Sequence, residues 1–194
     1  MPQPGGSPFF VFFASKDSGM LFSEIIGQEN IKSHLVRTTD NGRIPHAQLF
    51  VAPTGSGGLP MAIAYARYIL CSNTGGKNDS GDAACNLKFE KLSHPDLHFA
   101  FPVTTNEKVK KHPTSDAFLE EWRTFVSGHP YGSLFNWYQH LGIENKQGQI
   151  GVDEAEELCC KKRYERLRML RMVLPKTKHL VGTLKKETSQ GQKD

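Results

Sequence analysis

In the first half of the chain, a short apolar run leads into a glycine-rich turn, and a stretch with helical spacing of apolar residues follows. Leu49, Phe50 and Val51 form a short apolar run, and a turn of Pro, Thr, Ser and Gly residues follows at 53–58. From Met61 onward, apolar side chains recur at helical spacing. The pattern predicts a strand at 47–51, of the kind found in the middle of a parallel sheet covered on both faces. It also predicts a core helix after the turn.

A strand, a glycine turn and a helix are the framework of a phosphate-binding loop, in which backbone N–H groups point at an anion. The full pattern, G-x-x-x-x-G-K-[ST], adds a lysine for the phosphates and a hydroxyl for Mg²⁺. Here Ala52 replaces the first glycine, Gly58 takes the lysine position and Leu59 the hydroxyl position. Losing one charge-assisted bond alone costs roughly 1.5–3 kcal/mol, so tight binding of Mg-ATP is not expected.

The loop is therefore interpreted as a vestigial phosphate loop, a degenerate Walker A motif kept for its shape. An ordinary turn between a strand and a helix is the alternative interpretation. No catalytic residue is expected, and His46 before the strand is interpreted as a loop residue. The residues of the vestigial loop are Gly55, Ser56, Gly57 and Gly58.

Helical and strand periodicity continues on both sides of this loop. A helix is expected to begin near Gln28 and to stop at Asn41-Gly42, and a strand is expected at 97–103. Two amphipathic helices follow, one between Thr114 and His129 and a short one over 134–141. Their aromatic side chains are expected in a core or a subunit interface, because basic residues are not interleaved with them as nucleic-acid stacking would favour.

The order of these motifs carries a family resemblance. The pattern F-x-x-I-I-G-Q at 22–28, a helix, and P-H-A-x-L-F at 45–50 lead directly into the loop. This succession resembles the N-terminal AAA+ domain of bacterial DNA polymerase III clamp-loader subunits, and the delta-prime subunits most of all, since they commonly carry a degenerate loop. Segments 94–103 and 150–158 extend the resemblance over about residues 20–158. It implies an α/β fold, an AAA+ type P-loop domain with a parallel sheet flanked by helices and incomplete at its C-terminal end.

The resemblance also implies a function. Such subunits act as a non-catalytic stator in a ring that loads a sliding clamp at primer-template DNA during replication. The partners would be ATP-binding clamp-loader subunits, the clamp and, indirectly, DNA. Two alternatives stay open: a P-loop ATPase of the same class, and a small basic nucleic-acid-binding protein that acts through its tail. Gly58, Leu59 and the lack of an acidic pair after an apolar strand argue against the ATPase.

Charge is distributed unevenly along the 194 residues. The chain has 13 Lys and Arg against 17 Asp and Glu through Glu157, and 11 against 3 after it. Three regions are expected: a disordered leader at 1–19, with translation starting at Met1 or at Met20; a partial AAA+ like domain at 20–158; and a basic tail at 159–194. No apolar run is long enough to span a bilayer.

The tail has two interpretations. It is either the product of a shifted reading frame, which should not pack on the domain, or a basic amphipathic helix. The helix would place Tyr164, Leu167, Leu170 and Leu174 on one face and could touch nucleic acid. The frameshift is the favoured interpretation.

The four cysteines are Cys71, Cys85, Cys159 and Cys160. They do not form a secreted disulfide framework, so a reducing cytoplasm is the expected compartment. Related subunits carry a four-cysteine zinc module near the first two, and structural zinc needs four thiolate or imidazole ligands. Cys71 and Cys85 are thus zinc candidates that His94 and His98 could complete. A shortened loop without metal is the favoured interpretation.

Overall fold

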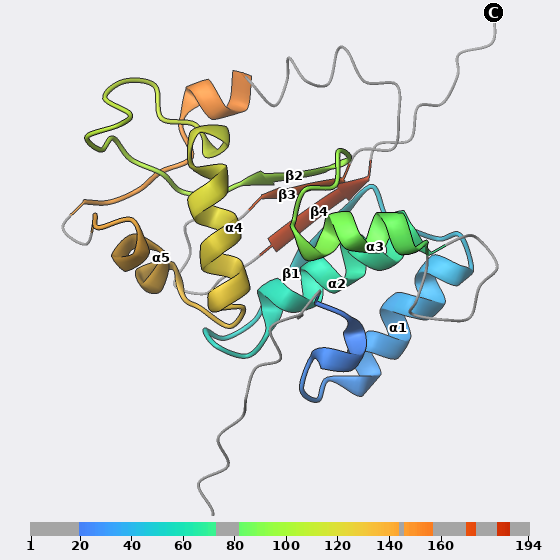
Figure 1. The fold of residues 1–194 in the computed structure, drawn as a ribbon. Coiled ribbons are helices and arrows are strands. Elements are labelled where there is room, and N and C mark those ends of the chain that lie inside the picture. The colour runs from blue at the N-terminus through green and yellow to red at the C-terminus, as the bar shows by residue number, and fades with distance from the viewer. Residues whose placement is uncertain (1–19, 73–81, 144–145, 157–169, 174–181, 187–194) are drawn as a thin grey trace, which may run out of the picture.

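The structure is a computed structural model that describes residues 20–72, 82–143, 146–156, 170–173 and 182–186. A helical turn at 152–156 carries no label in Figure 1. The labelled elements, in chain order, are η1 (Phe22–Glu24), α1 (Glu29–Asp40), β1 (Ala47–Phe50), α2 (Gly58–Cys71), α3 (Ala83–Glu90), β2 (Leu97–Ala100), η2 (Ser115–Phe118), α4 (Leu119–Gly128), α5 (Leu134–His140), β3 (Leu170–Val173) and β4 (Gly182–Lys186).

The sheet is mixed rather than fully parallel. Its strand order is β1-β4-β3-β2, in which β2 and β3 run parallel while β4 runs antiparallel to both β1 and β3. The register pairs Leu97 with Leu170 and Ala47 with Lys185. The α/β class with helices against a sheet is therefore present, but the expectation of a parallel sheet is wrong for the described strands.

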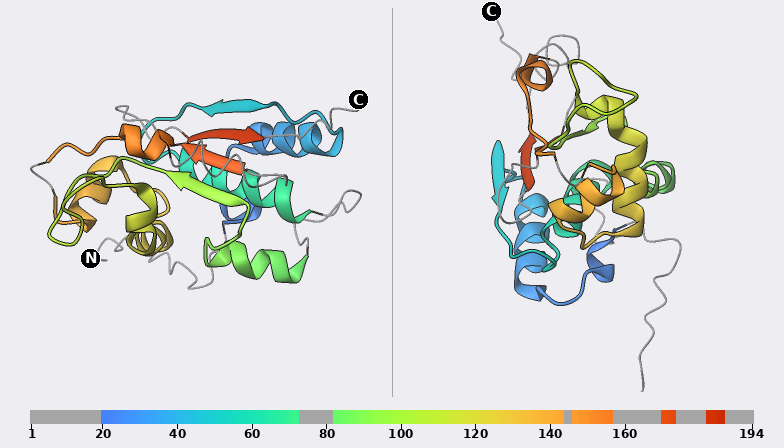
Figure 2. Two further views of the ribbon diagram at one scale, coloured as in Figure 1. Left: turned by 90° about the horizontal axis from the view of Figure 1, so that it is seen from above. Right: turned by 90° about the vertical axis from the view of Figure 1, so that its left-hand side faces the viewer.

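Strand β1 lies at the edge of this sheet, not in its middle. Leu49 is 62% exposed and Val51 beyond the strand is 73% exposed. In the right-hand view of Figure 2, α2 and α4 lie on one side of β1 and β4, which leaves the other side of β1 uncovered. The prediction of a central strand covered on both faces is therefore wrong. A local apolar run predicts a strand, but its neighbours in the sheet depend on distant pairing that the run does not encode.

Two segments of the tail supply the strands between β1 and β2. The expectation that the tail does not pack is therefore wrong for 170–173 and 182–186, and Leu170 lies in a strand instead of the expected helix. Tyr164, Leu167, Leu174, Cys159 and Cys160 lie outside the described residues, as does the leader at 1–19. The shifted reading frame stays a prediction.

The helices predicted between Gln28 and Leu141 are confirmed. Helix α1 ends where the Asn41 N–H donates to the Arg37 carbonyl, and Gly42 follows with a φ of 67°. Helix α2 contacts α1, α3 and β4, as Figure 1 shows. Because neighbours surround it, nearly all of its side chains are buried, among them Met61 and Tyr65.

An aromatic core lies where α4 and α5 meet the end of β2. The Phe101 ring stacks on Trp122 with centroids 4.3 Å apart, and Trp137 meets Trp122 edge-on at 5.1 Å. The Trp137 Nε1–H donates to the Pro102 carbonyl at 3.0 Å, so its one polar group is satisfied. These rings are buried, which confirms a core position for Trp122 and Trp137, whereas Phe135 on α5 is exposed. No described helix is long and apolar enough to cross a membrane.

Candidate functional site

The glycine turn at residues 53–58 connects the end of β1 to the first turn of α2. Ser56 closes it, because its N–H and its Oγ both donate to the Pro53 carbonyl, at 3.2 and 2.8 Å. Gly55 and Gly57 have φ values of 80° and 90°, in the left-handed region that favours glycine. The strand, turn and helix predicted from the sequence are therefore all present at this place.

Leu59 and Gly58 occupy the positions where a nucleotide-binding loop has its hydroxyl and its lysine. Leu59 is 1% exposed and belongs to the hydrophobic core cluster. A hydroxyl at this position would therefore replace a packed apolar side chain and would not simply face a ligand. Gly58 is half-buried and offers no cation.

Tyr131 fills the hollow of the glycine turn. It comes from the connection between α4 and α5, and its hydroxyl accepts a hydrogen bond from the Ile26 N–H at 3.4 Å. A Cβ added at Gly57 would lie 3.0 Å from Cε1 of the Tyr131 ring. The space left between the turn and the segment 130–132 is about 10 Å³. That volume holds one water molecule at most, so no phosphate group fits in it.

A larger groove of about 430 Å³ lies on the other side of the turn, between α1 and β1. It is lined by apolar side chains such as Ile31, Leu49 and Met61, together with Gln28, Gln48 and His34. None of its described lining residues is Asp, Glu, Lys or Arg. A Mg-nucleotide would thus find neither a cation for its phosphates nor a carboxylate for its metal there.

The two zinc candidates are joined to each other. Cys71 and Cys85 form a disulfide, and both sulfurs lie within 4.8 Å of a ring nitrogen of His94. Burial lowers the pKa of His94; the nearby Asp96 carboxylate raises it and Lys88 lowers it, both by less. The sequence analysis named these two cysteines as zinc candidates and favoured a loop without metal, and it did not predict their bond.

Zinc does not fit this group as it stands. The metal needs four ligands and takes cysteine as the thiolate, whereas the sulfurs are bonded to each other and the cluster found among the described residues has three members. His98, the fourth candidate, lies in β2 as predicted and is not in the cluster.

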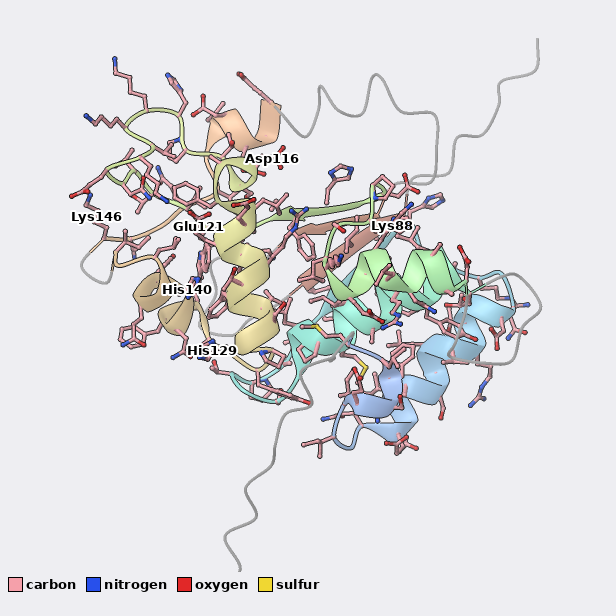
Figure 3. All side chains as sticks on the ribbon, in the orientation of Figure 1. Lys88, Asp116, Glu121, His129, His140 and Lys146 are labelled. Atoms are coloured by element: carbon pink, nitrogen blue, oxygen red, sulfur yellow. A yellow bond between two sulfur atoms is a disulfide. The ribbon has the colours of Figure 1, made fainter. Side chains whose placement is uncertain are left out.

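Among the described residues, no second group of three His, Cys, Asp or Glu side chains is close enough to hold a metal ion. Asp153 lies in the helical turn 152–156 and pairs with His112 at 2.7 Å. Glu154 is buried and accepts from the Ser115 N–H at 2.5 Å. The side chains labelled in Figure 3 come from different elements, and His129 and His140 both lie near Phe125. His46 is exposed.

Comparison with known proteins gives one result. A family model described as DNA polymerase III, delta subunit, matches residues 27–161, which is more than half of the chain. The matched range includes the glycine turn, Tyr131 and both bonded cysteines, and it is close to the 20–158 over which the resemblance was expected. No curated protein and no solved structure matches.

Proposed function

The chain belongs to the DNA polymerase III delta subunit family, whose members are clamp-loader subunits of DNA replication. We propose that this chain acts in the clamp loader as a delta-prime-like stator without ATPase activity. A stator holds its shape while neighbouring subunits bind and hydrolyse ATP. The observation that carries the proposal is the filled hollow of the glycine turn, into which Tyr131 packs against Gly57.

Two independent features support the absence of nucleotide chemistry. The first is chemical: Gly58 and Leu59 stand where a cation and a metal-holding hydroxyl belong. The second is spatial, since Tyr131 leaves only about 10 Å³ between itself and the turn on its side. The turn is held by packing instead of by a ligand, and we propose that no ATP and no zinc are bound.

The partners in this proposal are the ATP-binding subunits of the clamp loader, the sliding clamp and, through them, primer-template DNA in the cytoplasm. Phe135 on α5 is 58% exposed and Ile26 beside the glycine turn is also exposed. Large apolar side chains at the surface are the kind that anchor protein interfaces. Both residues are therefore candidates for contact with a neighbouring subunit.

Co-expression with the ATP-binding and clamp-opening subunits tests the proposal. We expect the chain to co-purify with them, and we expect an equilibrium titration of the isolated chain with labelled ATP and Mg²⁺ to show no binding below millimolar concentrations. Micromolar ATP binding would instead support the P-loop ATPase. A chain that ignores the partners and binds DNA with an affinity that falls steeply with salt would support the nucleic-acid-binding alternative.

A further inference from the structure

The disulfide joins the end of one helix to the start of the next. Cys71 is the last residue of α2 and Cys85 lies in the first turn of α3, with a sequence separation of 14 and Cα atoms 5.5 Å apart. This Cα distance is within the usual range for disulfide-bonded cysteines. The bond therefore closes a chain loop between two helices that also pack against each other.

Hydrogen bonds that do not involve sulfur hold the same two helix ends together. The Asp82 N–H donates to the Cys71 carbonyl at 3.1 Å, and the Asp82 carboxylate accepts from the Cys85 N–H at 3.3 Å. Arg67, one turn before Cys71 in α2, donates from Nε to Oδ1 of Asn86, the residue after Cys85 in α3, at 2.9 Å. After reduction these contacts would keep the two thiols near each other. The bond can thus open and close without large movement of α2 and α3.

We propose that Cys71 and Cys85 form a reversible thiol-disulfide site whose oxidising substrate is a small disulfide of the glutathione class. The thiolate of Cys85, the more exposed of the two at 9% against 4%, attacks one sulfur of the small disulfide. The attack forms a mixed disulfide and releases one small thiol. The thiolate of Cys71 then attacks Cys85 Sγ, which forms the protein disulfide and releases the second small thiol.

The exchange balances, since two protein thiols are oxidised to one disulfide while one small disulfide is reduced to two small thiols. The protons of the protein thiols end on the released small thiols. The oxidised state removes conformational freedom from the unfolded chain, and this stabilises the fold. The inference goes beyond the clamp-loader proposal and does not depend on it.

The experiment uses the full chain with Cys159→Ser and Cys160→Ser, so that only the two cysteines of interest remain. Protein is equilibrated at pH 7.5 in buffers that range from reduced to oxidised glutathione, quenched with acid, alkylated with a maleimide and analysed by mass spectrometry. We expect two alkylated thiols in reduced buffer and none in oxidised buffer, with both recovered after dithiothreitol. The thermal midpoint should be about 6–12 °C higher in the oxidised state.

Single variants provide the matched controls. In the same background, Cys71→Ser and Cys85→Ser should each stop at a mixed disulfide with glutathione, and their thermal midpoints should change little between the two buffers. The four-cysteine chain, digested after oxidation, should yield a peptide pair linked through Cys71 and Cys85.

Three results would overturn the proposal. The first is that both thiols are still alkylated after prolonged incubation in oxidised glutathione. The second is that oxidation of the two-cysteine protein ends in mixed disulfides or leaves the thermal midpoint unchanged. The third is that the reduced protein carries one zinc ion per chain and resists oxidation until a chelator removes the metal, which would make the pair a metal site.

Discussion

Tyr131 is expected to block the glycine turn even when a cation is restored to it. Gly58→Lys places an ammonium group where a nucleotide-binding loop has its lysine, and position 58 is half-buried, begins α2 and is not among the glycines with a positive φ. One charge-assisted bond to phosphate is worth about 1.5–3 kcal/mol, a gain of roughly 10- to 150-fold in affinity. That gain requires space for the phosphate, and only about 10 Å³ is present on the Tyr131 side of the turn.

Four proteins separate the effect of charge from the effect of space: wild type, Gly58→Lys, Tyr131→Ala and the double variant. Titration with a fluorescent ATP analogue should give no measurable binding for the first three and a weak, submillimolar affinity for the double variant. Tyr131 is 37% exposed, so its truncation should cost only about 1–2 kcal/mol of stability and leave the protein folded. Phe135→Ala combined with Gly58→Lys is the matched control, because it removes an exposed aromatic ring that lines neither of the two spaces beside the turn.

The reasoning fails if Gly58→Lys alone binds ATP as tightly as the double variant does. Tyr131 would then move aside at little cost, and the filled hollow would not explain the absence of nucleotide binding. If the control that carries Phe135→Ala binds ATP as tightly as the double variant with Tyr131→Ala, the binding comes from a general attraction between the new lysine and phosphate. Urea unfolding of all the variants should accompany the titrations, so that a loss of folded protein is not counted as a loss of affinity.

Three other measurements test the fold. Gly57→Ala should cost at least 1 kcal/mol more than Gly142→Ala in urea unfolding, because both glycines have positive φ but only Gly57 lies against a ring; equal costs would contradict this. Burial lowers the pKa of His94 in the folded state, so stability should fall as the pH drops through the pKa of His94 in the unfolded chain, about 6.5. His94→Gln should therefore reduce the change of the thermal midpoint between pH 7.5 and 5.5. Leu184→Pro should cost roughly 3 kcal/mol and speed proteolysis of the tail, since β4 pairs on both sides; an unchanged rate would show that the tail does not need β4.

The elements that the sequence predicted are those whose signals are local. Apolar spacing and stop signals identified α1, α2, α4 and α5, and each is present. Helix α3 was missed because its first residues follow a polar, glycine-rich stretch. A usable signal existed in Asp82, whose carboxylate accepts from the Ala84 and Cys85 N–H groups as a helix cap.

The errors concern contacts between distant parts of the chain. The pairing partners of β1 come from the tail, so no pattern within 47–51 could show that the strand lies at an edge. The contact of Tyr131 with Gly57 joins the α4–α5 connection to the glycine turn. The residues around Tyr131 were interpreted only as a helix stop. Such placements follow from packing, which local periodicity does not describe.

The same packing accounts for the glycines of the turn without reference to a ligand. Gly57 has a φ that favours glycine and a position where a Cβ would press on Tyr131, while Leu59 is part of the core. Each of these residues is thus required by the fold itself, in the absence of phosphate. In a subunit that binds ATP, the corresponding turn gains contacts when the nucleotide arrives and loses them when it leaves. Under the proposed stator function, a turn closed by its own tyrosine would keep its shape throughout an ATP cycle, which is the property that a stator needs.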